Sequence, residues 1–278
     1  MMRFRTQAHR PSISAQWVPY IKGAAGDAWI EPLSFAISWK NRGIDIQEAP
    51  GSAWRNDSAH FLLGLTFPRV GSSFSARIHR YASLFDAEAP TFIRDKPWDI
   101  TCYLNSSLAK RLMLSLNPTQ HFTQGDIARL PSLYVSECDK IGSVLTAAFE
   151  LSETHREPSV DYRSPGPSSW SRVQEWAQKA VDRPEGANLA EYIEELDPEP
   201  QSDHLSFALG VALGRFAPVD EQGQPITSNQ PGILDPKTAD FSHALHAGIL
   251  FLDGSLEESD HRDDLGQAAS TSLHDAWS

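Results

Sequence analysis

Arginine, histidine and serine side chains are concentrated between residues 69 and 80, and their types suit contacts with nucleic acid. Guanidinium, imidazole and hydroxyl groups donate hydrogen bonds to phosphate oxygens and to base edges. The candidate contacts in this stretch are Arg69, Ser72, Ser73, Arg77, His79 and Arg80. The alternative is that these residues form an ordinary solvated strand face with turn hydroxyls.

The elements that carry these residues are expected to be two antiparallel strands joined by a turn. Apolar residues alternate with others over residues 63–67 and again over residues 74–79, and a proline and a glycine mark the connection. A hairpin of this kind buries its apolar face. We therefore expect Arg77 and His79 to lie on the opposite, exposed face, with Arg77 the more ordered contact. Arg69, beside the turn, is expected to be a more adaptable phosphate contact.

The net charge of the 278-residue chain is −12, but the charge is unevenly distributed. Residues 1–115 contain 14 Lys and Arg against 9 Asp and Glu, whereas residues 116–278 contain 10 against 27. A basic first half suits phosphate contacts, and an acidic second half suits solvent or protein. An uneven surface without function is the alternative.

The composition, with 40% hydrophobic and 22% charged residues, predicts a globular chain. No apolar run is long enough to span a membrane, and the N-terminus lacks the apolar segment of a secretory signal, so the expected location is the cytoplasm. Cys102 and Cys138 are 36 residues apart and form no CxxC pair. They are expected to be buried free thiols in a reducing compartment.

Short strands are expected between residues 17 and 46. Residues 33–39 alternate cleanly, and residues 40–43 are typical of a turn with its glycine at positive φ. Ile44 and Ile46 then resume the period of two, which predicts a further strand.

The spacing becomes helical after residue 98. Apolar residues recur every four positions from Ile100 to Leu112, which predicts one helix over 99–116, ended by Asn117 and Pro118. A turn is expected over 125–133. Further helices are expected over 133–156, 169–196 and 203–216.

Several sequence blocks resemble a known family. WVPYIKG, SWKNRGIDI, WRND, GLTFP and FSAR occur in that order, and they resemble blocks in the target-recognition region of large bacterial adenine-specific DNA methyltransferases of the type IIG restriction and BREX or DISARM phage-defence kind. LNSS, the later Leu-Pro and ALGVALGRF fit the same family, the last through Gly210, Gly214, Arg215 and Phe216. The sequence departs from the family at Ala24, Phe67 and Ala82.

The resemblance implies a DNA-recognition module, and it adds Arg42 and Arg55, which lie in the matching blocks, to the candidate DNA contacts. A methyltransferase also needs a glycine-containing loop for S-adenosylmethionine and an Asn/Asp-Pro-Pro-Tyr/Phe clamp for the flipped adenine. Neither occurs in the sequence. No catalytic residue and no cofactor are therefore expected in this chain, and S-adenosylmethionine is expected only in an associated catalytic domain.

Other chemistry has weaker support. A metal site could be assembled near the C-terminus from Asp240, His243, His246, Asp260, His261 and Asp263. Spacing dictates no third ligand for the two histidines, so a solvated polar surface is favoured and no metal is expected. The motifs Gly-x-Ser-x-Gly and GxxxxGK[ST] are absent, which disfavours a serine hydrolase and a P-loop enzyme.

The sequence thus predicts an α+β fold. A β-rich recognition module is expected at 15–98, a helical region packed on it at 99–216, and a truncated, loop-rich acidic tail at 217–278. The expected function is DNA sequence recognition for an adenine-specific methyltransferase in restriction-modification or phage defence. Its expected partners are double-stranded DNA and a separate catalytic methyltransferase polypeptide or other defence-system proteins. The alternative is a protein-interaction module or orphan remnant that binds no DNA.

Overall fold

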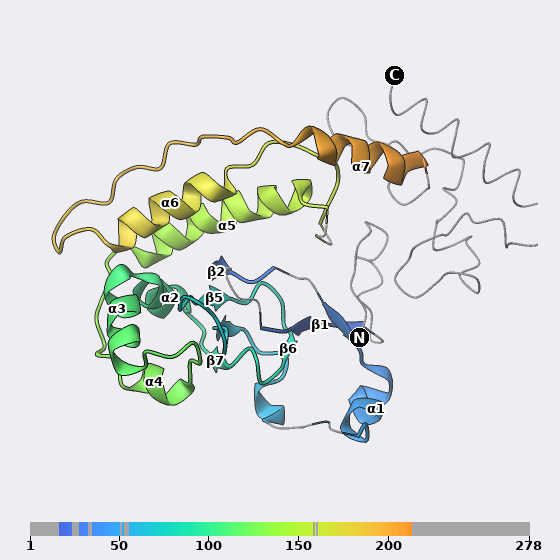
Figure 1. Cartoon of the computed structure of the whole chain (residues 1–278), viewed down its shortest axis with the longest axis horizontal. Coiled ribbons are helices and arrows are strands. Elements are labelled where there is room, and N and C mark those ends of the chain that lie inside the picture. The colour runs from blue at the N-terminus through green and yellow to red at the C-terminus, as the bar shows by residue number, and fades with distance from the viewer. Residues whose placement is uncertain are drawn as a thin grey trace, which may run out of the picture. The chain divides into compact units, whose positions relative to one another are not determined.

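The computed structural model describes residues 17–23, 28–32, 35–50, 52, 56–157, 159 and 161–212 (Figure 1). The chain divides into two compact units. Within the described residues, the larger unit comprises parts of 17–152 together with 168–197, and the smaller unit comprises parts of 153–167 together with 198–212. Strands come first along the chain and helices later, so the α+β class is confirmed. The expected tail at 217–278 lies outside the described residues.

Four short strands form a mixed sheet in the larger unit. In spatial order they are β2 (Trp29–Ile30), β5 (Arg77–Ile78), β4 (Gly64–Thr66) and β7 (Thr91–Ile93). β4 and β5 are antiparallel, with Leu65 opposite Ile78, as the alternation predicts. β4 also pairs with β7, and a side chain at Gly64 would meet the backbone carbonyl oxygen of Phe92. That close approach explains the glycine.

A second sheet has three strands. β1 (Trp17–Ile21) lies between β3 (Ala36–Ser38) and β6 (Leu84–Phe85), antiparallel to the former and parallel to the latter. β3 confirms the predicted strand. The predicted turn is a 3-10 helix, Lys40–Gly43, in which Gly43 has a φ of 79°.

The expected strand through Ile44 and Ile46 is wrong, because these residues begin the one-turn helix α1 (Ile44–Gln47). Two alternating residues cannot distinguish a strand from one helical turn. Gly43, in the left-handed conformation, separates the 3-10 helix from α1, and the Glu48 N–H donates to the Ile44 carbonyl at 2.9 Å to close a helical turn.

The single helix expected over 99–116 is two helices, α2 (Trp98–Asn105) and α3 (Ser107–Leu116). Ser106 separates them: its backbone is extended, and its side chain accepts a hydrogen bond from the Ala109 N–H, so it caps α3. The break rotates the buried face. Ala109 is buried while Leu108 is 42% exposed, so the four-residue period holds for α2 only.

The region expected to be a turn contains the short helix α4 (Gln124–Ala128). Thr123 and Asp126 form a reciprocal capping box at its start, which supplies partners for otherwise unpaired N–H groups.

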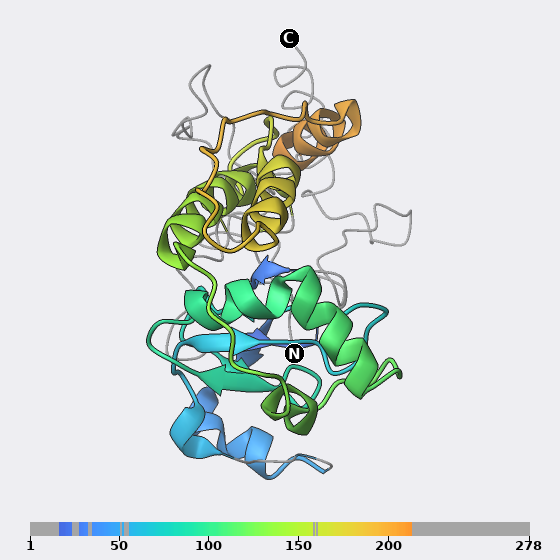
Figure 2. The same cartoon turned by 90° about the vertical axis from the view of Figure 1, so that its left-hand side faces the viewer.

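Two longer helices lie side by side, α5 (Cys138–His155) and α6 (Trp170–Val181) (Figures 1 and 2). Both are predicted, but α6 ends at Val181 rather than near residue 196. The residues that follow run without helix or strand to Pro200, apart from a backbone bridge between Ser168 and Asp197.

Two buried clusters stabilise the larger unit. The first joins β2, β5, α2, α5 and α6 through Trp29, Ile30, Ile78, Cys102, Cys138, Ile141, Leu145, Ala148, Phe149, Val173, Ala177, Ala180 and Val181. The second joins β4, the connection after it, α2, α3 and the segment around α4 through Leu65, Phe67, Phe74, Ala76, Tyr103, Leu104, Ala109, Met113, Phe122 and Ile127. Strands and helices from both sides of residue 98 therefore share their cores.

The described part of the smaller unit contains the end of α5 and α7 (Gln201–Ala212). The Ser206 hydroxyl donates to Glu157 at 2.7 Å, and the Phe207 ring lies edge-on to Tyr162. Gly210 is buried, whereas Gly214, Arg215 and Phe216 lie outside the described residues.

Candidate nucleic-acid interface

The connection between β4 and β5 presents three of the candidate contacts to solvent. Arg69, Ser72 and Ser73 are exposed, and half of the Arg69 side chain is accessible. The Arg69 Nη1 atom lies 3.7 Å from Glu88 Oε1 in a solvent-exposed ion pair. Pairs of this kind contribute little to stability, so the guanidinium can exchange this carboxylate for another anion at low cost.

Backbone hydrogen bonds hold this connection on two sides. The Arg69 N–H donates to the Glu88 carbonyl at 3.0 Å, and the Arg69 carbonyl accepts from the Phe122 N–H at 2.8 Å. The Gly71 N–H donates to the Gln120 carbonyl at 3.0 Å. The backbone is thus anchored while the side chains of Arg69 and the two serines project from it.

The expected exposure of Arg77 is wrong. Its side chain is 0% exposed, and its Nε donates to Glu31 Oε2 at 2.5 Å. β5 lies between β2 and β4 in the sheet, and the residues before and after Arg77, Ala76 and Ile78, are buried in the two clusters. The alternation correctly predicted opposite faces, but it assumed that one face is open to solvent. Arg77 is part of an interior ion pair.

His79 is also buried, which contradicts the exposed position expected for it. Its backbone N–H donates to the Gly64 carbonyl at 2.9 Å. Burial, together with the positive charge of Arg77, lowers the pKa of the imidazole to about 4. His79 is therefore neutral at pH 7 and carries no charge for a phosphate.

Acid should destabilise the chain through His79. The pKa of a histidine in the unfolded chain is about 6.5. Between that pH and about 4, His79 is therefore protonated in the unfolded chain but neutral in the folded chain. The contribution to stability is complete above pH 6.5 and is lost as the pH falls toward 4. When the pH is lowered from 7 to 5, the free energy of unfolding should fall by about 2 kcal/mol less in His79→Phe than in the parent, as measured by urea denaturation. Parallel pH profiles of the two proteins would contradict the assignment.

Arg80 and Arg42 occupy different environments. Arg80 is half-buried, with its guanidinium carbon 5.0 Å from the centre of the Tyr81 ring and 5.2 Å from that of Phe149, so it makes cation–π contacts. Arg42 is exposed beside the end of β3, with a φ of 57°. Arg55 lies outside the described residues. Of the candidate DNA contacts, only Arg69, Ser72 and Ser73 lie on the connection between β4 and β5.

Asn105, in the sequence LNSS, links α2 to the sheet, and the sequence does not predict its position. Its side chain is fully buried. Its Oδ1 accepts from the Ala76 N–H at 2.9 Å, and its Nδ2 donates to the Ala76 carbonyl at 2.8 Å. The side chain thus joins the end of α2 to the residue that precedes Arg77.

Among the described residues, no group of three or more His, Cys, Asp or Glu side chains is arranged to hold a metal ion. His243, His246 and the acidic residues considered with them lie outside the described part of the chain. None of the described helices is long and apolar enough to cross a membrane.

Comparison with known proteins does not assign the chain to a family. No protein-family model matches it, and no curated protein gives a significant match.

Proposed function

We propose that this chain recognises DNA sequence as the specificity part of an adenine-specific methyltransferase in restriction-modification or phage defence. The observation that carries the proposal is the exposed, backbone-anchored connection bearing Arg69, Ser72 and Ser73. Guanidinium and hydroxyl groups on an anchored backbone suit phosphate oxygens, and they lie in the half of the chain with more basic than acidic residues.

The ordered sequence blocks that resemble target-recognition regions also support this function. The roles of the arginines differ from those expected, however. Arg69 is the proposed phosphate contact, with Arg42 as a further exposed candidate, and Arg77 acts from inside by holding β5 against the segment that carries Glu31. Base readout would then come from groups on or near the connection after β4.

Catalysis is proposed to reside in a separate polypeptide or domain. The sequence contains no adenine clamp and no loop typical of S-adenosylmethionine binding. In this proposal the chain brings double-stranded DNA to a methyltransferase that holds the cofactor.

A protein-interaction role is the second candidate, and one observation favours it. The irregular segment after α6 is acidic and exposes two large apolar side chains, Ile193 at 79% and Leu196 at 50%. Exposed apolar groups among carboxylates suit a partner with apolar and basic groups. This segment would also serve to bind the proposed catalytic polypeptide.

The first test is selection from a random-site pool of duplex DNA, with and without a candidate catalytic polypeptide. The selected site is then titrated with the parent and with Arg69→Ala across a salt series. If Arg69 contacts a phosphate, the variant weakens binding to all sequences alike, and the slope of log K against log salt becomes shallower by about one.

Arg172→Ala is the matched control. Arg172 is similarly exposed and also forms an ion pair, with Asp197, but on α6. It should leave both the affinity and the slope unchanged. If the parent binds and the slope of log K against log salt is the same for the parent and Arg69→Ala, Arg69 does not contact a phosphate. Failure of the parent to select any site in either condition would refute DNA recognition and favour the protein-interaction role.

A further inference from the structure

The connection between β4 and β5 pairs with a second segment of the chain, the loop between α3 and α4. Val70 and His121 form an antiparallel bridge. Backbone hydrogen bonds of 2.8 and 3.0 Å flank the bridge on its two sides. Residues 69–71 and 120–122 therefore form a short two-stranded ribbon, and the exposed connection does not stand alone.

The two faces of the ribbon have different surroundings. The side chains of bridged residues lie on the same side of a strand pair, and their neighbours in sequence lie on the other side. Phe122 is buried in the second cluster, so its face of the ribbon is turned to the interior. Val70 is 42% exposed and His121 is also exposed, so the opposite face meets solvent. The outward face thus presents a branched apolar group beside an imidazole.

Side-chain hydrogen bonds fix the backbone that leads into His121. Asn117 Nδ2 donates to the His121 carbonyl at 2.6 Å and to Asp126 Oδ2 at 2.9 Å, and Asp126 belongs to the capping box of α4. The Thr119 hydroxyl accepts from the His121 N–H at 3.2 Å. In the part of the chain that the structure describes, no residue pairs with the imidazole of His121. Its ring nitrogens are therefore available to a ligand on a preorganised backbone.

Groups of these two kinds match the major-groove edges of base pairs. A neutral imidazole has one N–H donor and one acceptor nitrogen, so it can pair with the hydrogen-bonding groups of a base edge. Apolar side chains contact the methyl group of thymine, which lies in the major groove. A two-stranded β-ribbon is narrow enough to enter that groove.

We propose that the outward face of this ribbon reads base pairs in the major groove of DNA. His121 forms a hydrogen bond to a base edge, and Val70 contacts a thymine methyl group. The inference rests on the proposed DNA recognition and assigns base contacts that this function requires. Arg69 directly precedes Val70, so a phosphate contact at Arg69 would fix the position of the ribbon along the duplex.

The test of His121 starts from the site that the full chain selects from random duplex DNA, with or without the catalytic polypeptide. The affinities of the parent and of His121→Ala are measured for this site and for each single base-pair substitution in it. We expect His121→Ala to reduce discrimination about tenfold at one position, because one hydrogen-bonded base contact is lost. The slope of log K against log salt should equal that of the parent, in contrast to Arg69→Ala, because no phosphate contact is removed.

Val70 is tested with modified DNA. Each thymine of the selected site is replaced in turn by uracil, which lacks only the methyl group. We expect one of these replacements to weaken binding of the parent by about fourfold, which corresponds to one buried methyl group. The same replacement should have no effect on binding of Val70→Ala.

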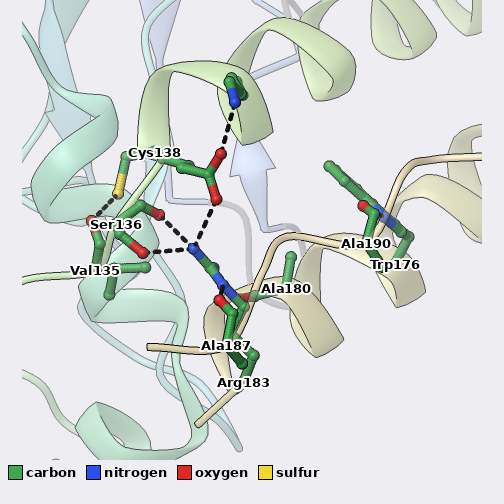
Figure 3. Close-up of polar contacts among 10 residues, drawn as sticks. Val135, Ser136, Cys138, Trp176, Ala180, Arg183, Ala187 and Ala190 are labelled. Carbon is green, nitrogen blue, oxygen red and sulfur yellow. Dashed lines mark hydrogen bonds and ion pairs between the residues drawn. The ribbon is translucent and has the colours of Figure 1, made fainter. Parts of the chain in front are cut away.

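Leu133→Ala is the matched control for Val70→Ala. Leu133 is 44% exposed, almost the same as Val70. It also lies on an anchored backbone, since Arg183 Nη2 donates to the carbonyl oxygen of Ser136 at 3.0 Å and to its hydroxyl at 2.6 Å (Figure 3). Leu133→Ala should respond to uracil as the parent does.

The outcomes separate this inference from the proposed function. If the parent selects a site but His121→Ala keeps its discrimination at every position and Val70→Ala keeps its response to uracil, the ribbon does not read bases, while DNA recognition stands. If the parent selects no site in either condition, DNA recognition fails and the inference fails with it. Both variants should unfold at the same urea concentration as the parent, because they truncate exposed side chains.

Discussion

Replacing Arg77 by methionine is expected to lower the free energy of unfolding by about 3–5 kcal/mol, measured by urea denaturation at pH 7. The change removes the cation from a pair in which both side chains are buried, with Nε of Arg77 2.5 Å from Glu31 Oε2. Glu31 would remain inside the protein as a carboxylate without that cation. Desolvation of an uncompensated charge, rather than loss of the attraction itself, gives the effect its size.

Two variants make this expectation specific. Arg69→Met removes an exposed arginine that also has an acidic partner, and it should change stability by no more than about 0.5 kcal/mol. Arg77→Met combined with Glu31→Leu removes both buried charges and should recover much of the loss. If Arg77→Met alone lowers the free energy of unfolding by less than about 1 kcal/mol, the buried ion pair does not contribute to stability as expected.

The second large effect is expected at Asn105. Asn105→Ala should destabilise the protein by about 2–4 kcal/mol, because it removes the side-chain acceptor of the Ala76 N–H and opens a cavity at the end of α2. The Ala76 carbonyl loses one donor but keeps the Trp29 N–H at 2.9 Å. Thermal and urea unfolding at constant pH would measure the loss.

Asn105→Asp is the matched variant, because it has almost the same shape. At pH 7 its carboxylate can accept from the Ala76 N–H but places a second oxygen against the Ala76 carbonyl, so we expect it to be at least as destabilising as alanine. At low pH the protonated acid regains a donor, and the aspartate variant should recover stability relative to the alanine variant. Equal behaviour of both variants at all pH values would contradict the two-way contact.

The sequence predicted those features that depend on interactions between residues close together in the chain. The alternation around β4 and β5 gave their antiparallel pairing, and the glycine after 3-10 residues 40–42 gave the positive φ at Gly43. Each depends on the period of the chain or on backbone sterics within a few residues.

Helix and turn boundaries were less predictable because single side chains decide them. Ser106 caps α3 and so divides one expected helix into two, and Thr123 with Asp126 starts a helix where a turn was expected. In each case a side-chain hydrogen bond supplies the partner that a helix end lacks, and this competes with the apolar period.

Burial was decided only by the tertiary structure. By itself, the sequence determined the α+β order, the strand pairing around residues 64–78 and the types of group available to meet a phosphate. It could not show that Arg77 and His79 are buried where β5 lies between β2 and β4, or that Cys102 of α2 and Cys138 of α5 belong to one buried cluster. Periodicity specifies which side of a strand or helix a residue occupies, but whether that side meets solvent depends on elements distant in sequence.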